Sequence, residues 1–251
     1  MKAVKIVVFI AVAFVWQCSW GMTGYSSFKD SVSAENQQID HSKFGMLLKK
    51  YVSASGNVDY AAFKKDIKQL DAYLKQLSAN VPQKNASKNV RLAYWMNAYN
   101  AFTIKLILNK YPVNSIKDIS GKPWSIKFIQ LGGKTYDLNT IEHEILRKMG
   151  DPRIHVGINC ASVSCPKLLN RAFHPEIVDK DLDLLAREFL RDKSKNQIRP
   201  DEIKISKIFS WFKNDFTQNG GLIDWINKYS EVKVKTNAKI NYLEYDWNLN
   251  K

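Results

Sequence analysis

The chain has 251 residues, a formal net charge of +14 at pH 7, and 45% hydrophobic residues. This length and composition suit one large domain with a sizeable core, so a second domain is not required. The basic residues are scattered rather than gathered in one block, and no nucleic-acid-binding motif accompanies them. We therefore expect no specific nucleic-acid partner. The charge is typical of a solvated surface, and it also favours contact with anionic surfaces.

The N-terminus has the layout of a secretory signal peptide. Lys2 and Lys5 precede an apolar run from Ile6 to Trp16, and Ser19 and Gly21 are the small residues of a cleavage site. The run is too short to span a bilayer stably, and no other segment approaches the required length. We therefore expect an exported protein, periplasmic or secreted, without a transmembrane anchor.

Cys18 allows an alternative in which the chain carries a lipid at its mature N-terminus. Gln17 is a poor residue to precede a lipidated cysteine, so cleavage after Gly21 is the preferred interpretation. The mature chain then keeps two cysteines, Cys160 and Cys165.

Apolar periodicity predicts the elements in chain order. We expect helices at residues 44–51, 61–77, 90–109, 139–149, 176–192, 208–216 and 222–229. We expect a hairpin at 126–136, and β segments at 154–158, 198–205 and within 232–249. The predicted fold class is α+β: a single helix-rich domain with small antiparallel β elements around a buried central helix.

The central helix, at 90–109, is apolar nearly all round, which is typical of a buried helix. Asn97 and Asn100 nevertheless fall inside one of its apolar arcs. A buried amide costs about 1–3 kcal/mol unless its hydrogen bonds are met, so the pair predicts a polar network here. That network either buttresses a loop or supports a functional site.

Glu142 and His143 belong to the helix expected at 139–149. Asn139 is a suitable N-cap, and Glu142, three residues later, completes a pattern like a capping box. The Glu142 carboxylate lies within the apolar arc of this helix and therefore needs a partner. Capping supplies the partner in one interpretation, and a histidine across a cleft supplies it in the other.

Reactive residue types gather where the segment 154–158 ends. Alternation along a strand places His155, Gly157 and Asn159 on one face, with space beside the imidazole and Cys160 entering the turn. Thiol-based acyl transfer needs a thiolate, an imidazole to take its proton, and an amide or carboxylate to orient the ring. The segment contains these types together.

Three roles are open for Cys160 and Cys165. They could form a disulfide, natural in an oxidising compartment and stabilising by about 2 kcal/mol. One of them could instead be a free nucleophile assisted by His155 or His143. Finally, these four residues could bind zinc, although the cysteine spacing is loose for a structural zinc site. We expect no metal, and we expect no cofactor because the chain has no nucleotide-binding glycine motif.

An ordered series of motifs resembles the domain of unknown function 547 family over roughly residues 44–250. The motifs are Val58–Tyr60, Ala93–Ala101, Tyr111–Pro112, Ser115–Ile119, Ile141–His143, Asp151–His155, Asn159–Ser162, Ser164–Pro166, Ile208–Phe209, Trp211, Asp215–Phe216 and Tyr245–Asn250. The resemblance implies no activity. It implies that Asn97, Asn100, Glu142, His143, His155, Cys160 and Cys165 fall on motif positions. The predicted division is a signal peptide at 1–21, a loose N-terminal segment at 22–43 and the family-like domain at 44–250.

These patterns together predict a thiol-dependent hydrolase or acyl-transfer enzyme that acts on an unknown small-molecule or peptide substrate. The expected site comprises Cys160, slightly ahead of Cys165, as nucleophile, His155 as base, Glu142 or Asn159 as the orienting group, and His143 lining the cleft. The alternative is a non-catalytic binding protein, in which the cysteines form a structural disulfide and the basic surface contacts an anionic envelope partner.

Overall fold

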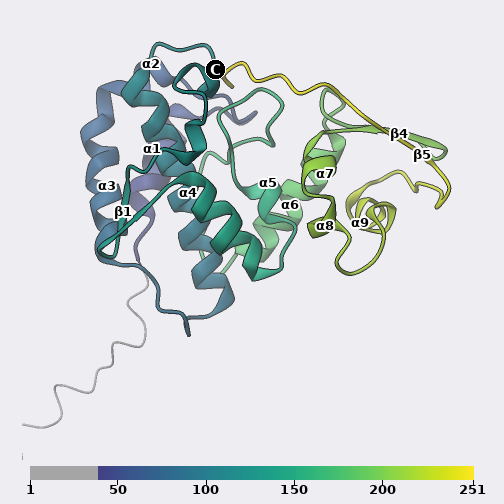
Figure 1. Cartoon of the computed structure of the whole chain (residues 1–251), viewed down its shortest axis with the longest axis horizontal. Coiled ribbons are helices and arrows are strands. Elements are labelled where there is room, and N and C mark those ends of the chain that lie inside the picture. The colour runs from purple at the N-terminus through teal and green to yellow at the C-terminus, as the bar shows by residue number, and fades with distance from the viewer. Residues whose placement is uncertain (1–38) are drawn as a thin grey trace, which may run out of the picture. The chain divides into compact units, whose positions relative to one another are not determined.

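Helices surround one long central helix in the first half of the computed structural model, which describes residues 39–251. These helices are α1 (Ser42–Tyr51), α2 (Tyr60–Phe63), η1 (Lys64–Asp66), α3 (Ile67–Ala79) and α4 (Lys88–Lys110). α3 packs against α4, and α1 packs against α3 (Figure 1). The predicted signal peptide and Cys18 lie outside the described residues.

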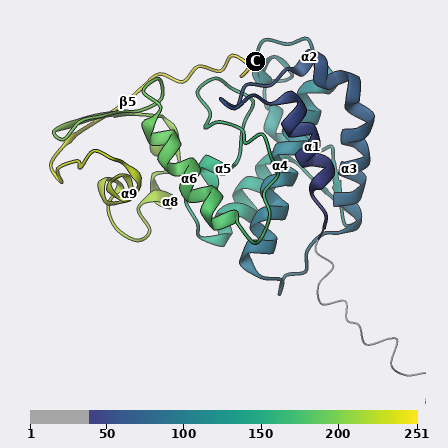
Figure 2. The same ribbon diagram turned by 180° about the vertical axis from the view of Figure 1, so that it is seen from behind.

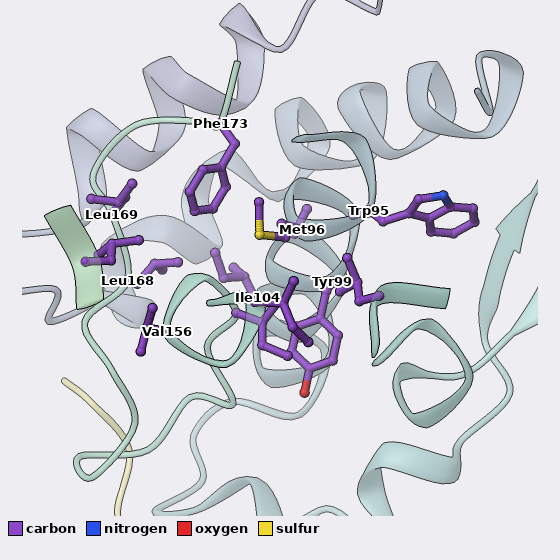
Figure 3. Packing of buried hydrophobic residues seen from close by; sticks show 14 of the residues in the cluster. Trp95, Met96, Tyr99, Ile104, Val156, Leu168, Leu169 and Phe173 are labelled. Carbon is purple, nitrogen blue, oxygen red and sulfur yellow. The ribbon is translucent and has the colours of Figure 1, made fainter. Parts of the chain in front are cut away.

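α4 is the predicted buried helix. The Ser87 hydroxyl accepts a hydrogen bond from the Val90 backbone N–H at 3.3 Å, which sets the start of the helix. Sixteen of its 23 residues are buried. Figure 3 shows Met96 beside Phe173, while Tyr99 projects from another side of α4. The core therefore surrounds this helix, as its all-round apolar character predicts.

A hairpin and several short helices follow α4. They are η2 (Ile116–Asp118), η3 (Pro123–Ser125), β1 (Ile129–Leu131), β2 (Lys134–Tyr136), η4 (Thr140–Leu146), η5 (Arg147–Met149) and α5 (Ile154–Gly157). β1 and β2 pair antiparallel, and Gly132 and Gly133 between them both have positive φ, of 56° and 73°. Glycine adopts two such angles in succession without strain, and the predicted hairpin is confirmed.

The second half of the chain adds one long helix, a small sheet and three short helices. Its elements are α6 (Val178–Arg191), β3 (Gln197–Ile198), β4 (Glu202–Ile205), α7 (Ile208–Trp211), α8 (Lys213–Phe216), α9 (Leu222–Tyr229) and β5 (Lys239–Tyr242). β3 pairs antiparallel with β4, but β5 pairs parallel with it, so this sheet is mixed. The helix-rich α+β class is confirmed.

The strand predicted at 154–158 is wrong, because these residues form the single helical turn α5 and its C-terminal cap. All of their side chains are buried, so apolar alternation carries no information about a solvent face. The space predicted at Gly157 is also filled by other side chains. A Cβ on Gly157 would lie 2.8 Å from Met96 Sδ and 2.9 Å from Leu182 Cδ2, so α5 is packed tightly between α4 and α6.

The prediction that the whole segment 22–43 is loose is wrong at His41. Its side chain is 1% exposed, and Nδ1 lies 2.7 Å from the Tyr73 hydroxyl. The packed part of the chain therefore begins before residue 44. Of the helices in residues 39–251, none combines the length and the apolar character that a membrane span requires.

The C-terminal segment returns across the domain after β5. Figures 1 and 2 show it running from β5 to the neighbourhood of α2. At its end the Val58 N–H donates to the Asn250 carbonyl at 2.7 Å, and on the way the Val163 N–H donates to the Asn248 carbonyl at 2.8 Å. This crossing brings the aromatic residues of the C-terminus onto the loop that follows α5.

Candidate functional site

A cavity of about 180 Å³ holds all five residues predicted to be catalytic: Glu142, His143, His155, Cys160 and Cys165. The other lining residues are Tyr99, Trp124, Asn139, Ile158, Ile208, Trp211, Phe212, Tyr245 and Trp247. They come from α4, η3, η4, α7, the loop after α5 and the C-terminal segment. The cavity thus joins a few polar groups to largely aromatic walls, a combination common in ligand sites.

Cys160 and Cys165 are free thiols whose Sγ atoms lie 2.9 Å apart. A disulfide bond is about 2.05 Å long, so the predicted disulfide is not present in the structure. The Cys160 backbone N–H donates to Cys165 Sγ at 3.0 Å. Cys165 is buried, whereas Cys160 is only partly buried and therefore more accessible from the cavity.

Hydrogen bonds around Cys160 favour its thiolate. Its Sγ lies 3.1 Å from Ser162 Oγ and 3.2 Å from Tyr245 Oη, in addition to Cys165. The hydrogen bond from Cys165 lowers the pKa of Cys160 to about 7, and those from Ser162 and Tyr245 act in the same direction against the effect of burial. Burial raises the pKa of Cys165. Cys160 is therefore the thiol that ionises near neutral pH.

The loop that carries Cys160 is held by buried amides. Asn100 donates to the Gly157 carbonyl at 3.0 Å and accepts from the Asn159 N–H at 2.8 Å. Asn159 in turn accepts from the Ala161 N–H at 2.8 Å. Ala161 has a φ of 61°, a left-handed conformation that residues other than glycine adopt mainly where their surroundings enforce it, often at active sites. Asn100 therefore supports the cysteine loop.

Asn97 has the other predicted role, that of a structural buttress. Its amide donates to the Phe173 carbonyl at 2.9 Å, and its carbonyl oxygen accepts from the Phe173 N–H at 2.9 Å. Both bonds hold a loop that does not line the cavity.

His155 lies between two carboxylates. Its Nε2 is 2.8 Å from Asp215 Oδ2, and its Nδ1 is 3.8 Å from Glu142 Oε1. The Phe212 ring stacks on the imidazole with a centroid separation of 3.8 Å. Burial lowers the pKa of His155, although Asp215 opposes the effect. The neutral imidazole donates from Nε2 to Asp215 and leaves Nδ1 as an acceptor facing Glu142.

Asp215 takes the orienting role that we predicted for Glu142 or Asn159. Arg147 donates two hydrogen bonds to its carboxylate, of 2.6 Å from Nε and 2.8 Å from Nη2. Burial alone would raise the pKa of Asp215, but the hydrogen bonds from Arg147 and His155 hold it below its ordinary value. We did not predict this residue as part of the site, because it lies 60 positions from His155. Its place in a family motif was the available signal.

Glu142 is not a helix-capping residue. It lies in η4, a π-helix, and such widened turns are frequent at functional sites. The Thr140 N–H and hydroxyl bind Asp137 instead, at 2.6 and 2.7 Å. The Tyr99 hydroxyl donates to Glu142 Oε2 at 3.1 Å. Burial raises the pKa of Glu142 to about 7 despite this bond, and the charge on Cys160 contributes to the rise.

The predicted direct pair of a thiol and a histidine is not formed. Within residues 39–251 no hydrogen bond joins either cysteine to a histidine, and His143 Nδ1 accepts from Arg147 Nη1 at 3.1 Å. His155 is instead hydrogen-bonded to Asp215, and its Nδ1 lies 3.8 Å from Glu142 Oε1, beyond hydrogen-bonding distance. Over the same residues, no group of three or more His, Cys, Asp or Glu side chains is arranged to hold a metal ion.

The comparison with known families matches residues 83–190 to the family described as "Protein of unknown function, DUF547". No curated protein and no solved structure matches the chain. The matched part contains α4, η4 and the cysteine loop, whereas Asp215 and Tyr245 lie beyond it. Residues 83–190 are therefore similar to the family of proteins of unknown function DUF547.

Proposed function

We propose that this protein is a cysteine-dependent hydrolase or acyl transferase with Cys160 as its nucleophile. One observation carries the proposal: Cys160 Sγ lies within 3.2 Å of Cys165 Sγ, Ser162 Oγ and Tyr245 Oη on the wall of a cavity. Such surroundings favour a thiolate near neutral pH, and the thiolate is the reactive form of cysteine.

In the first step, the Cys160 thiolate attacks the carbonyl carbon of an acyl donor. A carbon–sulfur bond forms, and the π electron pair of the carbonyl moves to its oxygen. The Tyr245 hydroxyl lies beside Sγ, and burial raises its pKa well above the ordinary value, so it stays protonated and can donate to the developing oxyanion. The bond to the leaving group then breaks, and the acyl group remains on Cys160 as a thioester.

Glu142 suits the proton transfers in this sequence. Its pKa of about 7 lets the protonated carboxyl group donate to the leaving group and lets the carboxylate then accept a proton from water or another acceptor nucleophile. The attack of that nucleophile on the thioester releases the product and restores the Cys160 thiolate. Tyr99 positions Glu142 by donating to Oε2, and His155, held by Asp215, lies with Nδ1 3.8 Å from Glu142 Oε1 rather than acting directly on the thiol.

The test is capture of the acyl-enzyme. The purified protein is mixed with p-nitrophenyl acetate at pH 7.5, quenched in acid, and analysed by intact mass and peptide mapping. We expect one acetyl group on Cys160 in the wild type and in Cys165→Ala, and none there in Cys160→Ala. Equal ester turnover in the wild type and in Cys160→Ala, without an adduct on Cys160, would exclude this mechanism.

We also propose export, which rests on the first 21 residues alone. Protein recovered from the periplasm or the medium should have an intact mass that corresponds to a chain beginning at Met22. A cytoplasmic chain that begins at Met1 would contradict this.

The net charge of +14, of which +12 remains when Lys2 and Lys5 leave with the signal peptide, supports contact with an anionic envelope surface. Co-sedimentation with vesicles that contain anionic lipid should fall steeply as salt is added, and binding that does not change with salt would contradict this contact.

A further inference from the structure

We infer that the cavity accepts an acyl group that carries no negative charge and ends in one flat ring, of the size of a benzoyl group. This inference rests on the proposed function, because the ring must be attached to the carbonyl that Cys160 attacks. Three independent features of the cavity lead to it: the character of its walls, its volume and its charge.

The walls present flat aromatic surfaces. Trp211 and Trp247 are stacked with an interplanar angle of 24°, and Tyr245 lies 4.5 Å from Trp247 between ring centroids. Trp124 contacts Trp247 edge to face at 5.4 Å. Aromatic rings favour offset-stacked and edge-to-face neighbours, and a flat ligand ring extends such a cluster more closely than a flexible chain does. Trp211 is 47% exposed, which places this surface at the entrance.

The volume admits one ring. An apolar protein cavity of about 150 Å³ is known to bind benzene, and the cavity here is slightly larger, at about 180 Å³. The difference leaves room for the carbonyl group beside Cys160. The cavity is half open, so a fused double ring or a long alkyl chain would leave part of its surface in solvent instead of against the walls.

The charges around the cavity disfavour an anionic acyl group. Arg147 is paired with Asp215, so its charge is not available to an anionic ligand. An anion would also meet the partly ionised Cys160 and Glu142, which line the cavity. A neutral group avoids this repulsion.

The first experiment measures binding without turnover. Full-length Cys160→Ala is titrated by ligand-observed NMR with benzamide, octanamide, 1-naphthamide and the anionic 4-carboxybenzamide. We expect benzamide to bind at least tenfold more tightly than the other three. Trp211→Ala in the same background should weaken benzamide binding about fivefold, and the matched control Tyr242→Ala, on β5 away from the cavity, should leave it unchanged. Equal or tighter binding of the alkyl, fused-ring or anionic amide overturns the inference.

The second experiment separates this inference from the proposed function. Wild-type kcat/KM is measured for p-nitrophenyl benzoate, octanoate and 1-naphthoate, each divided by its uncatalysed rate, and we expect the benzoate to be preferred about tenfold. Benzamide binding without turnover of any ester refutes the proposed function and leaves the ligand class standing. Turnover through Cys160 without preference for the single ring refutes the ligand class alone.

Discussion

At the scale of single residues, the chemistry of the cavity depends on two groups that titrate near pH 7. Cys160 reaches this range because neighbours donate hydrogen bonds to its sulfur, and Glu142 reaches it because burial disfavours its charge. Hydrogen bonds lower the pKa of Cys160, whereas burial raises the pKa of Glu142, so substitutions at different residues can test the two effects separately.

Alkylation tests the origin of the Cys160 thiolate. Iodoacetamide should modify Cys160 without prior reduction, at a rate that increases as the pH rises through about 7, since the thiolate is the reacting form. Cys165→Ala removes the strongest donor and should move the midpoint to higher pH, whereas Cys165→Ser retains a donor and serves as the control. Intact mass measures the product. Alkylation only after reduction would indicate the disulfide of the binding-protein alternative.

Glu142→Gln should raise stability at alkaline pH while abolishing acyl transfer. The pKa of Glu142 is raised from 4.5 to about 7 by folding, so the folded protein binds more protons in this window and loses stability as the pH rises through it. The neutral amide of glutamine removes this loss. The free energy of unfolding of Glu142→Gln should therefore be higher than that of the wild type by about 2–3 kcal/mol at pH 8, and the difference should be much smaller at pH 4.5. Urea unfolding at both pH values measures the difference. An equal difference at both would contradict the raised pKa.

At the scale of elements, α4 holds each of two loops through the side-chain amide of an asparagine, and only one of these loops carries Cys160. Asn100 binds the loop of Cys160, and Asn97 binds the backbone of Phe173. The two side chains are three residues apart on one buried helix, so each serves as the matched control for the other.

Asn100→Ala and Asn97→Ala should each destabilise the protein by about 1–3 kcal/mol, because each leaves buried backbone groups unpaired. Only Asn100→Ala should also slow the alkylation of Cys160, since only it frees the Asn159 backbone. Urea unfolding and the alkylation rate at pH 7 measure the two effects. Equal alkylation rates in both variants would show that Asn100 has no role beyond stability.

Periodicity predicts the long elements well and the short ones poorly. α4 and the hairpin of β1 and β2 follow directly from apolar pattern and glycine placement. The π-helix η4 differs from the predicted helix in its start. Asn139 binds Ser125 Oγ at 2.9 Å rather than capping, and Asp137 supplies the cap. Competing side-chain partners that are distant in sequence decide such ends.

At the scale of the whole molecule, the C-terminal crossing closes the site. Asn250 accepts from the Tyr60 hydroxyl at 2.8 Å and donates to the Gly56 carbonyl at 3.2 Å, which anchors the end of the chain beside α2. This anchor holds Tyr245 against Cys160, 85 positions away in sequence.

Asn250→Ala should lower Tm by about 2–4 °C if it costs about 1 kcal/mol, a typical value for a buried hydrogen bond in a domain of this size. It should also speed the alkylation of Cys165, which is 5% exposed beneath the crossing. Lys251→Ala, on the exposed neighbour, is the control and should change neither value. An unchanged rate of Cys165 alkylation in Asn250→Ala would show that the C-terminal segment does not cover the site.

The sequence by itself determined the helix-rich class, the buried helix and the residue types of the site, because apolar periodicity and local clustering are properties of neighbouring residues. Glu142, His155 and Cys160 could be named on that basis. Only the tertiary structure decided that Asp215 orients His155, that Tyr245 faces Cys160 and that the segment at 154–158 is helical. Each of these depends on contacts between distant parts of the chain, which set side-chain partners, burial and pKa together.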